Sequence, residues 1–482
     1  HLECCVPEVS SPIQRYDHYY PGGIARAEYI QTLGTLFGSE QALMSFPYDS
    51  FLWDIAENET TYPEDITVPF LLIGGWFDIN IEDVWHNWNL LTASSPVADL
   101  HKIVIGPWVH GGAGPAHVGS LQQGDLEYPE AEHYNEERAL DMFDYYLRDI
   151  ANGYANDNPI EVFDLGTKNW WEGTQQEYDQ LVALHIYNVF TTDSTVSNAS
   201  QLASTPTLTY SYDPSDPSPA VGGHVLSLEQ GPLDQVPEVL SRTDQVPFNL
   251  KIAYDGPIRG SIKVKLWAST DQLDTDIIVR LCQEQGDGKI VEICSKGQRM
   301  RFLEGMTEAA EEFLAPDEKY LVTISLPPIE LTPNYDDLWL VVSSSEYPHF
   351  NRNMNNGLEM YPDLNPDSLF QPIVAMNSLH SSTSYPSTIE LPMDGSIWSV
   401  NDIDSPDLFG LFPNPAKNEV TLAASGQVEE LRIYGSDGKL VLHRFPSQST
   451  FTISIKDLSA GHYTVQSQID GIWTARPLLV IQ

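Results

Sequence analysis

Basic residues are scarce in this chain of 482 residues. It has 24 Lys and Arg against 68 Asp and Glu, which gives a formal net charge of −44. A surface of that sign repels phosphate backbones, so the composition argues against nucleic acid as a partner. We read the excess of acidic residues as a solubility feature, suited to a salty medium that screens self-repulsion.

Long apolar runs are missing as well, and the sequence therefore predicts no transmembrane segment. The four cysteines show no CxxC or His-rich spacing, so neither a metal nor another cofactor is predicted. Cys282 and Cys294 flank an expected hairpin, where they form either a cross-strand disulfide or two small buried side chains. The acidic run DQLDTD (271–276) is read as a strand-edge turn, because it lacks the glycine and the spacing of a calcium loop.

An initiator methionine and a signal peptide are also absent. The chain starts at HLECCVPEVSS, inside a strand-like segment. We therefore expect residue 1 to be the start of a fragment.

The pattern of apolar residues divides the chain into several parts. Residues 1–165 alternate apolar runs with helical patterns, which predicts an α/β layered fold. Residues 166–393 carry short alternating runs between turn-rich stretches, which are typical of an antiparallel sandwich or jelly roll, and we predict the jelly roll. A polar linker at 394–408 leads to a small β-sandwich at 409–482.

A single titratable residue follows each of two apolar runs in the first part. Asp78 comes after LLIGGWF and His110 after KIVIGPWV. In open α/β sheets, reactive groups gather at the carboxyl ends of the strands. A carboxylate there fixes the tautomer of an imidazole that acts as a general base. Taken singly, Asp78 is equally a turn or N-cap residue before the helical pattern at 81–91, and His110 a surface histidine.

The order Asp then His, each after a strand, is the second half of the Ser…Asp…His order of α/β hydrolases. The first half would be a G-x-S-x-G nucleophile elbow, and the sequence contains none. The sequence therefore supplies two members of a hydrolytic triad and raises the question of where the serine lies.

Several ordered motifs carry a family resemblance. VPFLLIGGWFDIN and IVIGPWVHGG resemble the segments that hold the triad aspartate and histidine in the cocaine esterase and X-prolyl dipeptidyl-peptidase group of serine hydrolases. VFDLGTKNWWEG, LWASTDQLDTDIIVRL and SSSEYPHFNRNMNNG resemble the C-terminal β-domain of that group. The resemblance covers about 1–393. It implies an α/β-hydrolase fold with a helical cap at 23–66, a small ester, amide or peptide substrate, and Asp78 and His110 as catalytic residues.

The same resemblance answers the question of the serine. In this group the strand after the nucleophile elbow reads much like HLECCVPEVSS, which implies that the serine lies a short way upstream of His1 and that this chain alone is inactive. Trp76, Trp85 and Trp108 are expected to contact substrate, and the alternative for them is core packing. A non-catalytic exported binding or surface protein, derived from a hydrolase, is the alternative function.

The sequence is compatible with both esterase and peptidase activity. In the α-amino-acid ester hydrolase branch, acidic residues that bind a substrate ammonium follow the triad aspartate by two and three places. Here those places hold Asn80 and Ile81, and the acidic Glu82 and Asp83 are offset.

The tail carries a second resemblance. LFPNPAKNEVTL, IYGSDGKLV and LSAGHYTVQ resemble the C-terminal sorting domain of the bacterial type IX secretion system. This implies export across the outer membrane, to the cell surface or the medium, with the secretion machinery as a partner. The alternative is a sandwich module that binds carbohydrate.

Overall fold

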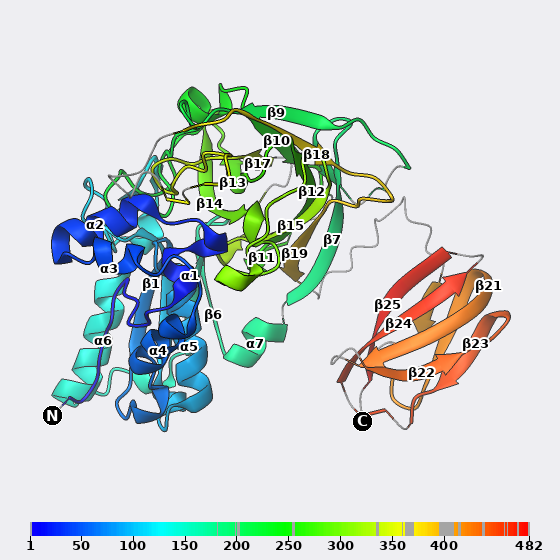
Figure 1. Cartoon of the computed structure of the whole chain (residues 1–482). Helices are drawn as coiled ribbons and strands as arrows, with labels where there is room; N and C mark the ends of the chain where they lie inside the picture. Colours follow the sequence, from blue (N-terminus) through cyan, green and yellow to red (C-terminus); the bar gives the residue numbers. More distant parts are fainter. Residues whose placement is uncertain are drawn as a thin grey trace. The chain divides into compact units, whose positions relative to one another are not determined.

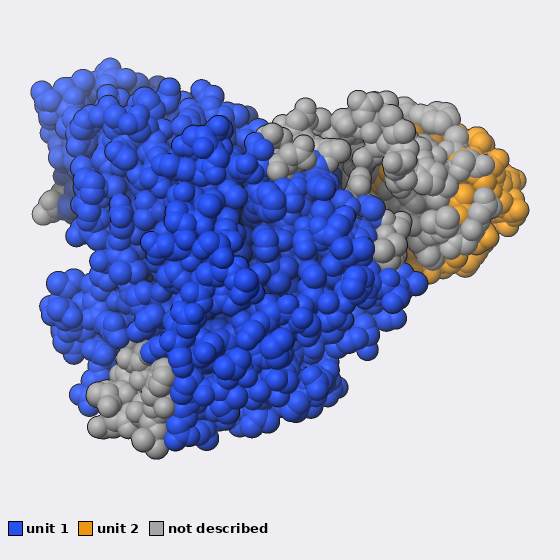
Figure 2. All heavy atoms as spheres, turned by 90° about the horizontal axis from the view of Figure 1, so that it is seen from above, with its two compact units in different colours: residues 1–397 blue, residues 398–482 orange. Residues whose placement is uncertain are grey.

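The computed structural model divides into two compact units, residues 1–397 and 398–482 (Figure 2), and each is described by itself. The structure describes residues 2–180, 182–197, 199, 203–252, 256–333, 337–358, 360–361, 371–394, 409–412, 416–435, 439–456, 458–459, 461–469 and 472–480. The predicted linker lies outside the described residues except for Asp394, as do the Pro-Asn-Pro of the tail and residues 436–438 of its expected turn.

The helices of the first unit lie mostly in its N-terminal part (Figure 1). They are α1 (Tyr16–Tyr19), α2 (Ala27–Phe37), α3 (Glu40–Met44), α4 (Phe51–Thr60), α5 (Ile81–Ser94), α6 (Tyr134–Arg148) and α7 (Gln175–Gln180). The first four fall in or beside the range predicted as a helical cap. In the described ranges, no helix has both the length and the apolar character needed to cross a membrane.

A four-stranded sheet forms the centre of this part. Its strands run in the order β1 (Leu71–Phe77), β2 (Lys102–Val109), β5 (Ile160–Asp164) and β6 (Asn169–Gly173). β1, β2 and β5 are parallel, and β6 is antiparallel to β5. Every residue of β1 and β2 is buried, which explains why both read as continuous apolar runs instead of alternating ones. The α/β layered fold predicted for this region is thus present.

The first residues of the chain extend this sheet. The backbone of residues 5–9 runs parallel to β1, with Leu71 N–H donating to the Cys5 carbonyl and Ile73 N–H to the Pro7 carbonyl, both at 3.0 Å. Leu2 is 58% exposed, whereas Val6 and Val9 are half-buried. The segment HLECCVPEVSS, which the sequence predicted to be strand-like, therefore pairs with β1 as a strand would.

The second part of the first unit is rich in strands. Within the described residues, thirteen strands are joined by hydrogen bonds, mostly in antiparallel pairs, with the main order β14-β13-β17-β10-β8-β7-β19-β12-β18-β9. They are β7 (Val182–Phe190), β8 (Thr195–Ser197), β9 (Leu208–Tyr212), β10 (Gln245–Leu250), β11 (Ile258–Gly260), β12 (Lys263–Thr270), β13 (Asp276–Glu284), β14 (Ile290–Arg299), β15 (Tyr320–Ser325), β16 (Ile329–Leu331), β17 (Leu338–Ser343), β18 (Ala375–His380) and β19 (Thr388–Asp394). A small hairpin of β3 (Gln122–Gln123) and β4 (Leu126–Glu127) lies before them in the chain. The antiparallel pairing follows the predicted alternation, and the jelly-roll winding stays a prediction.

The two cysteines of the expected hairpin are buried and free. Their strands, β13 and β14, do pair, but a register shift after Leu281 sets Leu281 opposite Cys294 and Cys282 opposite Glu292. The second alternative, two small buried side chains, is the one the structure shows.

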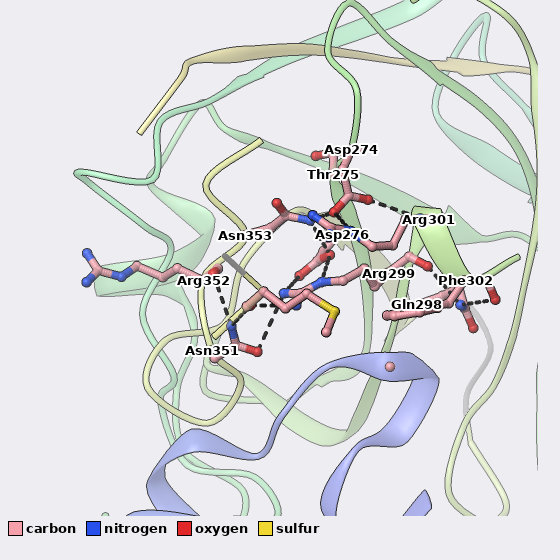
Figure 3. A network of polar contacts seen from close by, with 12 residues as sticks. Asp274, Thr275, Asp276, Gln298, Arg299, Arg301, Phe302, Asn351, Arg352 and Asn353 are labelled. Carbon is pink, nitrogen blue, oxygen red and sulfur yellow. Dashed lines mark hydrogen bonds and ion pairs between the residues drawn. The ribbon is translucent and has the colours of Figure 1, made fainter. Parts of the chain in front are cut away.

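The DQLDTD segment contributes two aspartates to a buried polar network (Figure 3). Asp276 accepts two hydrogen bonds of 2.9 Å from Arg299, and Asp274 accepts one of 2.6 Å from Arg301. The amide of Asn353 donates to both carboxylates at 2.8 Å. The oxygens that a calcium ion would need are therefore engaged by arginine and asparagine. Within the part of the chain that the structure describes, no cluster of three His, Cys, Asp or Glu side chains is arranged to hold a metal ion.

The second unit is a β-structure with its own core. Its strands are β20 (Phe409–Phe412), β21 (Glu419–Gly435), β22 (Leu440–Arg444), β23 (Gln448–Ser454), β24 (Gly461–Ile469) and β25 (Ile472–Val480). The order is β20-β21-β24-β25, with β22 and β23 also paired to the long β21. Val420, Leu431, Val465 and Leu478 are among the fully buried core side chains.

Candidate active site

Asp78 and His110 meet at the carboxyl ends of β1 and β2. The two strands are parallel neighbours, and Phe77 stands opposite Val109 in the register, so the next residue of each strand emerges at the same edge. Nδ1 of His110 lies 2.9 Å from Oδ1 of Asp78. Because an ionised carboxylate only accepts hydrogen bonds, this contact puts the proton of the neutral imidazole on Nδ1 and leaves Nε2 as the basic nitrogen.

Asp78 and His110 differ in their exposure to solvent, and each affects the pKa of the other. Asp78 has no exposed surface, whereas the side chain of His110 is 31% exposed. Burial raises the pKa of Asp78 above its ordinary value, against the opposing effect of the hydrogen bond from His110. Burial acts to lower the pKa of His110, but the hydrogen bond and charge of Asp78 outweigh it, so the pKa of His110 is raised. The buried carboxylate thus stabilises an imidazolium on a partly exposed ring.

The local backbone explains why the strands end here. A Cβ atom at Gly75 would lie 2.1 Å from the carbonyl oxygen of Trp108, so β1 and β2 approach each other this closely only with glycine. After Asp78 the chain turns into α5, with Ile81 N–H donating to the Asp78 carbonyl at 3.1 Å. After His110 the chain continues through Gly111 at a φ of +89°, which favours glycine.

His110 lines two cavities. The larger, of about 1020 Å³, has a mostly apolar wall that includes Leu33, Leu36 and Phe37 from α2. The smaller, of about 780 Å³, is lined by side chains of the 5–9 segment and α6, among them Val9 and Phe143. Both cavities therefore border His110.

The three tryptophans expected to contact substrate lie elsewhere. Trp76 and Trp108 are buried in the core, and their indole N–H groups donate to the carbonyls of Phe163 (2.6 Å) and Ala131 (3.3 Å). Trp85 is half-buried, stacks on Tyr178 with ring centroids 5.4 Å apart, and lines a separate cavity of about 410 Å³. Of the described residues that line the two cavities beside His110, none is one of these tryptophans. For Trp76 and Trp108, core packing with a satisfied N–H is the observed state.

A second Asp–His pair, which was not predicted from the sequence, lies behind the larger cavity. Tyr29 of α2 lines this cavity, and its hydroxyl lies 3.0 Å from Nε2 of His18. Nδ1 of His18 is in turn 2.5 Å from Oδ2 of the buried Asp83, which also pairs with Arg15 at 2.6 Å. Burial opposes ionisation of Asp83, but His18 and Arg15 hold its pKa below the usual range. Asp83, one of the two acidic residues offset from the ammonium-binding places, is therefore the first member of a polar chain through His18 to Tyr29, which lies at the cavity.

Known proteins match large parts of this chain. Residues 144–390 match the family model of the X-Pro dipeptidyl-peptidase C-terminal non-catalytic domain. The cocaine esterase of Rhodococcus sp. (strain MB1 Bresler) is 26% identical over 345 residues, which cover 68% of this chain and 57% of that protein. The chain belongs to the family that carries the X-Pro dipeptidyl-peptidase C-terminal domain, and it is similar to a cocaine esterase. It spans 57% of the length of the esterase that it matches.

Solved structures of several hydrolases share the fold of this chain. An aminopeptidase from the marine sediment archaeon Thaumarchaeota archaeon matches with a TM-score of 0.67 at 19% identity, over 82% of this chain and 72% of that one. An α-amino acid ester hydrolase matches with a TM-score of 0.59 at 19% identity, over 81% and 73% of the two chains. A CocE/NonD family hydrolase from Staphylococcus aureus matches with a TM-score of 0.56 at 16% identity, over 82% and 67%. Identities of this size support a shared fold and leave the activity to other arguments.

The second unit of this family member has a match of its own. Residues 410–481 match the secretion system C-terminal sorting domain. This domain indicates export by type IX secretion to the cell surface or the medium. The prediction made from the tail motifs is therefore confirmed.

Proposed function

We propose that Asp78 and His110 are the acid and the base of a Ser-His-Asp triad that hydrolyses ester or amide bonds, and that the nucleophilic serine lies upstream of residue 1. The observation that carries the proposal is the 2.9 Å contact between His110 Nδ1 and Asp78 Oδ1 at the carboxyl ends of two parallel strands. Two further facts support it. His110 lines two cavities, and the esterase relative is longer than the part of it that this chain matches.

The proposed reaction uses the two nitrogens of His110 differently. Nε2 takes the proton of the serine hydroxyl while the serine oxygen attacks the substrate carbonyl carbon. The imidazolium then gives that proton to the leaving oxygen or nitrogen as its bond to the carbonyl carbon breaks, which leaves an acyl-enzyme. Water repeats the two steps and releases the acid. Asp78 stays ionised throughout and stabilises the imidazolium through Nδ1.

The larger cavity supports a substrate with an apolar part. Leu33, Leu36 and Phe37 line it on the side of α2, and the described polar groups along its wall include Tyr29 and Asn80. A pocket with a mostly apolar lining and a few polar groups is typical of small-molecule sites. We propose esters and amides, including the peptides cleaved by dipeptidyl-peptidases, as the substrate class.

The test compares variants of the complete protein in the hydrolysis of a chromogenic ester such as p-nitrophenyl acetate. His110→Asn is expected to lower kcat by about four orders of magnitude or more, because the serine then lacks its base. His133→Asn is the matched control, since the side chain of His133 is 63% exposed and pairs only with Glu136 among the described ion pairs. Equal activity of the two variants would contradict the proposal.

A further inference from the structure

One loop between β9 and β10 reaches the carboxyl ends of β1 and β2. We call residues 222–231 the clamp loop. Gly223 and Gly231 close it by exchanging backbone hydrogen bonds of 2.8 and 3.1 Å. A Cβ atom at Gly231 would lie 2.9 Å from Cγ1 of Val109, the residue that precedes His110. The loop therefore packs directly against the end of β2.

Gln230 of the clamp loop binds the peptide groups that follow His110. Its Oε1 accepts a hydrogen bond of 2.8 Å from the N–H of Gly111, and its Nε2 donates one of 3.0 Å to the carbonyl of the same residue. The second Nε2 hydrogen reaches the Leu226 carbonyl at 2.8 Å. Gln230 is 2% exposed, so these bonds form away from solvent. One side chain thus fixes both polar backbone groups of Gly111.

His224 of the same loop binds the other strand of the site. Its Nε2–H donates to the carbonyl of Trp76 at 2.7 Å, two residues before Asp78. His224 is 2% exposed, and burial lowers its pKa to about 4, so the ring is neutral at ordinary pH. The clamp loop therefore contacts the backbone beside both Asp78 and His110.

The backbone on the other side of His110 is held in the same manner. Oε1 of the buried Gln123 accepts a hydrogen bond of 3.0 Å from the N–H of Val109. Beyond Gly111, by contrast, Gly112 and Gly114 have φ values of +88° and +76°, and a Cβ atom on either would meet no atom within 4 Å. Gln230 therefore binds the backbone at Gly111, between the end of β2 and the glycine-rich segment 112–114. Glycine gives that segment wide conformational freedom.

We propose that Gln230 is a positioning residue, which fixes the backbone of Gly111 and thereby holds the imidazole of His110 against Asp78. Gln230 itself touches none of the reacting groups. The proposal rests on the proposed function, since it gives the domain whose family model is described as non-catalytic a part in aligning the catalytic base. Removing the side-chain amide frees the Gly111 peptide and lets the ring of His110 leave its hydrogen bond to Asp78.

The test uses the complete protein with ¹³C-labelled histidine and four variants. Gln230→Met keeps the length of the side chain and removes its hydrogen bonds. Gln230→Asn keeps the amide but is too short by one methylene to reach Gly111. Gln122→Ala is the control. Gln122 is exposed and precedes Gln123 in the chain, and among the described residues its side-chain amide contacts only the Gly124 carbonyl. His110→Asn identifies the His110 signal by its loss.

Two readouts are expected to change together. In Gln230→Met, hydrogen–deuterium exchange in the peptide around 108–114 speeds up by about tenfold, as expected for the loss of buried hydrogen bonds. In the same variant the pKa of His110 falls toward its ordinary value, because the bond to Asp78 loosens. Gln230→Asn shows both changes as well, because its amide does not reach Gly111, and Gln122→Ala shows neither.

A folded Gln230→Met protein with unchanged exchange and an unchanged His110 titration would overturn the proposal. If Gln230→Met does not fold, Gln230→Asn decides by the same two readouts. Neither readout needs a serine nucleophile. A loss of the proposed hydrolase activity and a loss of the positioning role are therefore distinguishable.

Discussion

Nδ1 of His110 lies 2.9 Å from Oδ1 of Asp78, a carboxyl group without exposed surface, although the two residues are 32 positions apart in the chain. The contact exists because two fully buried parallel strands end side by side. It fixes the tautomer of the ring and, in the proposed triad, supplies a negative charge beside the imidazolium that forms during the reaction.

Replacing Asp78 by Asn tests that electrostatic role. The amide keeps the size of the side chain but removes the charge and favours the wrong imidazole tautomer. We expect kcat for an ester in the complete protein to fall by about 10⁴-fold, with a small change in KM. Asp99→Asn, at an exposed aspartate, is the control and should match the unchanged protein. A fall of less than tenfold for Asp78→Asn would speak against a triad.

The titration of His110 gives a second prediction. Its pKa is raised in the fold, so an NMR titration should place the midpoint above about 6.5. The proposed hydrolysis needs the neutral ring as a base, and activity should therefore be lost as the pH falls through that midpoint. The stability that His110 contributes has the opposite sense: it is present below the unfolded pKa of about 6.5 and is lost as the pH rises through the folded value.

Asp78→Asn provides the comparison for this titration. Without the carboxylate, burial alone acts on the ring, and the pKa of His110 should fall below its value in the unchanged protein. A midpoint that does not move would show that Asp78 is not the group that perturbs His110.

The buried network around Asp276 predicts a large effect on stability. Arg299→Met leaves the carboxylate of Asp276 buried without its two charged hydrogen bonds, which should lower the free energy of unfolding by about 3–5 kcal/mol. Arg148→Met breaks an ion pair with Asp144 on the surface of α6 and should change the free energy of unfolding by about 0.5 kcal/mol or less. Urea unfolding of the two variants measures the difference, and equal effects would refute the assignment of a structural role to the network.

Alanine substitutions at two glycines near the site should lower the stability of the protein by different amounts. Gly75→Ala places a Cβ against the backbone of Trp108 and forces β1 from β2, at a cost of about 3 kcal/mol or more. Gly112→Ala meets open space and bears only the strain of a positive φ, about 1 kcal/mol. Thermal melting ranks the two. A Gly75→Ala protein as stable as Gly112→Ala would mean that the close approach of the strands is not required.

The sequence predicted the parts of the site that depend on strand ends. Parallel buried strands bring their carboxyl ends to one edge, so Asp78 and His110 could be placed together from local pattern alone. The chain of Asp83, His18 and Tyr29 could not be predicted, because its members come from segments that share no periodic pattern.

Other differences arose from features that local sequence does not encode. The apolar runs that contain Trp76 and Trp108 place each indole near a strand end, but they do not show on which face of the sheet the ring lies. In the structure both rings are buried in the core. A register shift after Leu281 decided which residue faces Cys294. Gln230 binds Gly111 from 119 positions away, a pairing that only the tertiary fold creates.

The most direct measurement of the central claim is a fluorophosphonate label on the protein from its native source, with the adduct mapped by peptide mass spectrometry. The account predicts one adduct, on a serine in a peptide upstream of His1, and its loss in His110→Asn. A folded native protein that takes no label, or one whose label stays in His110→Asn, would contradict the account.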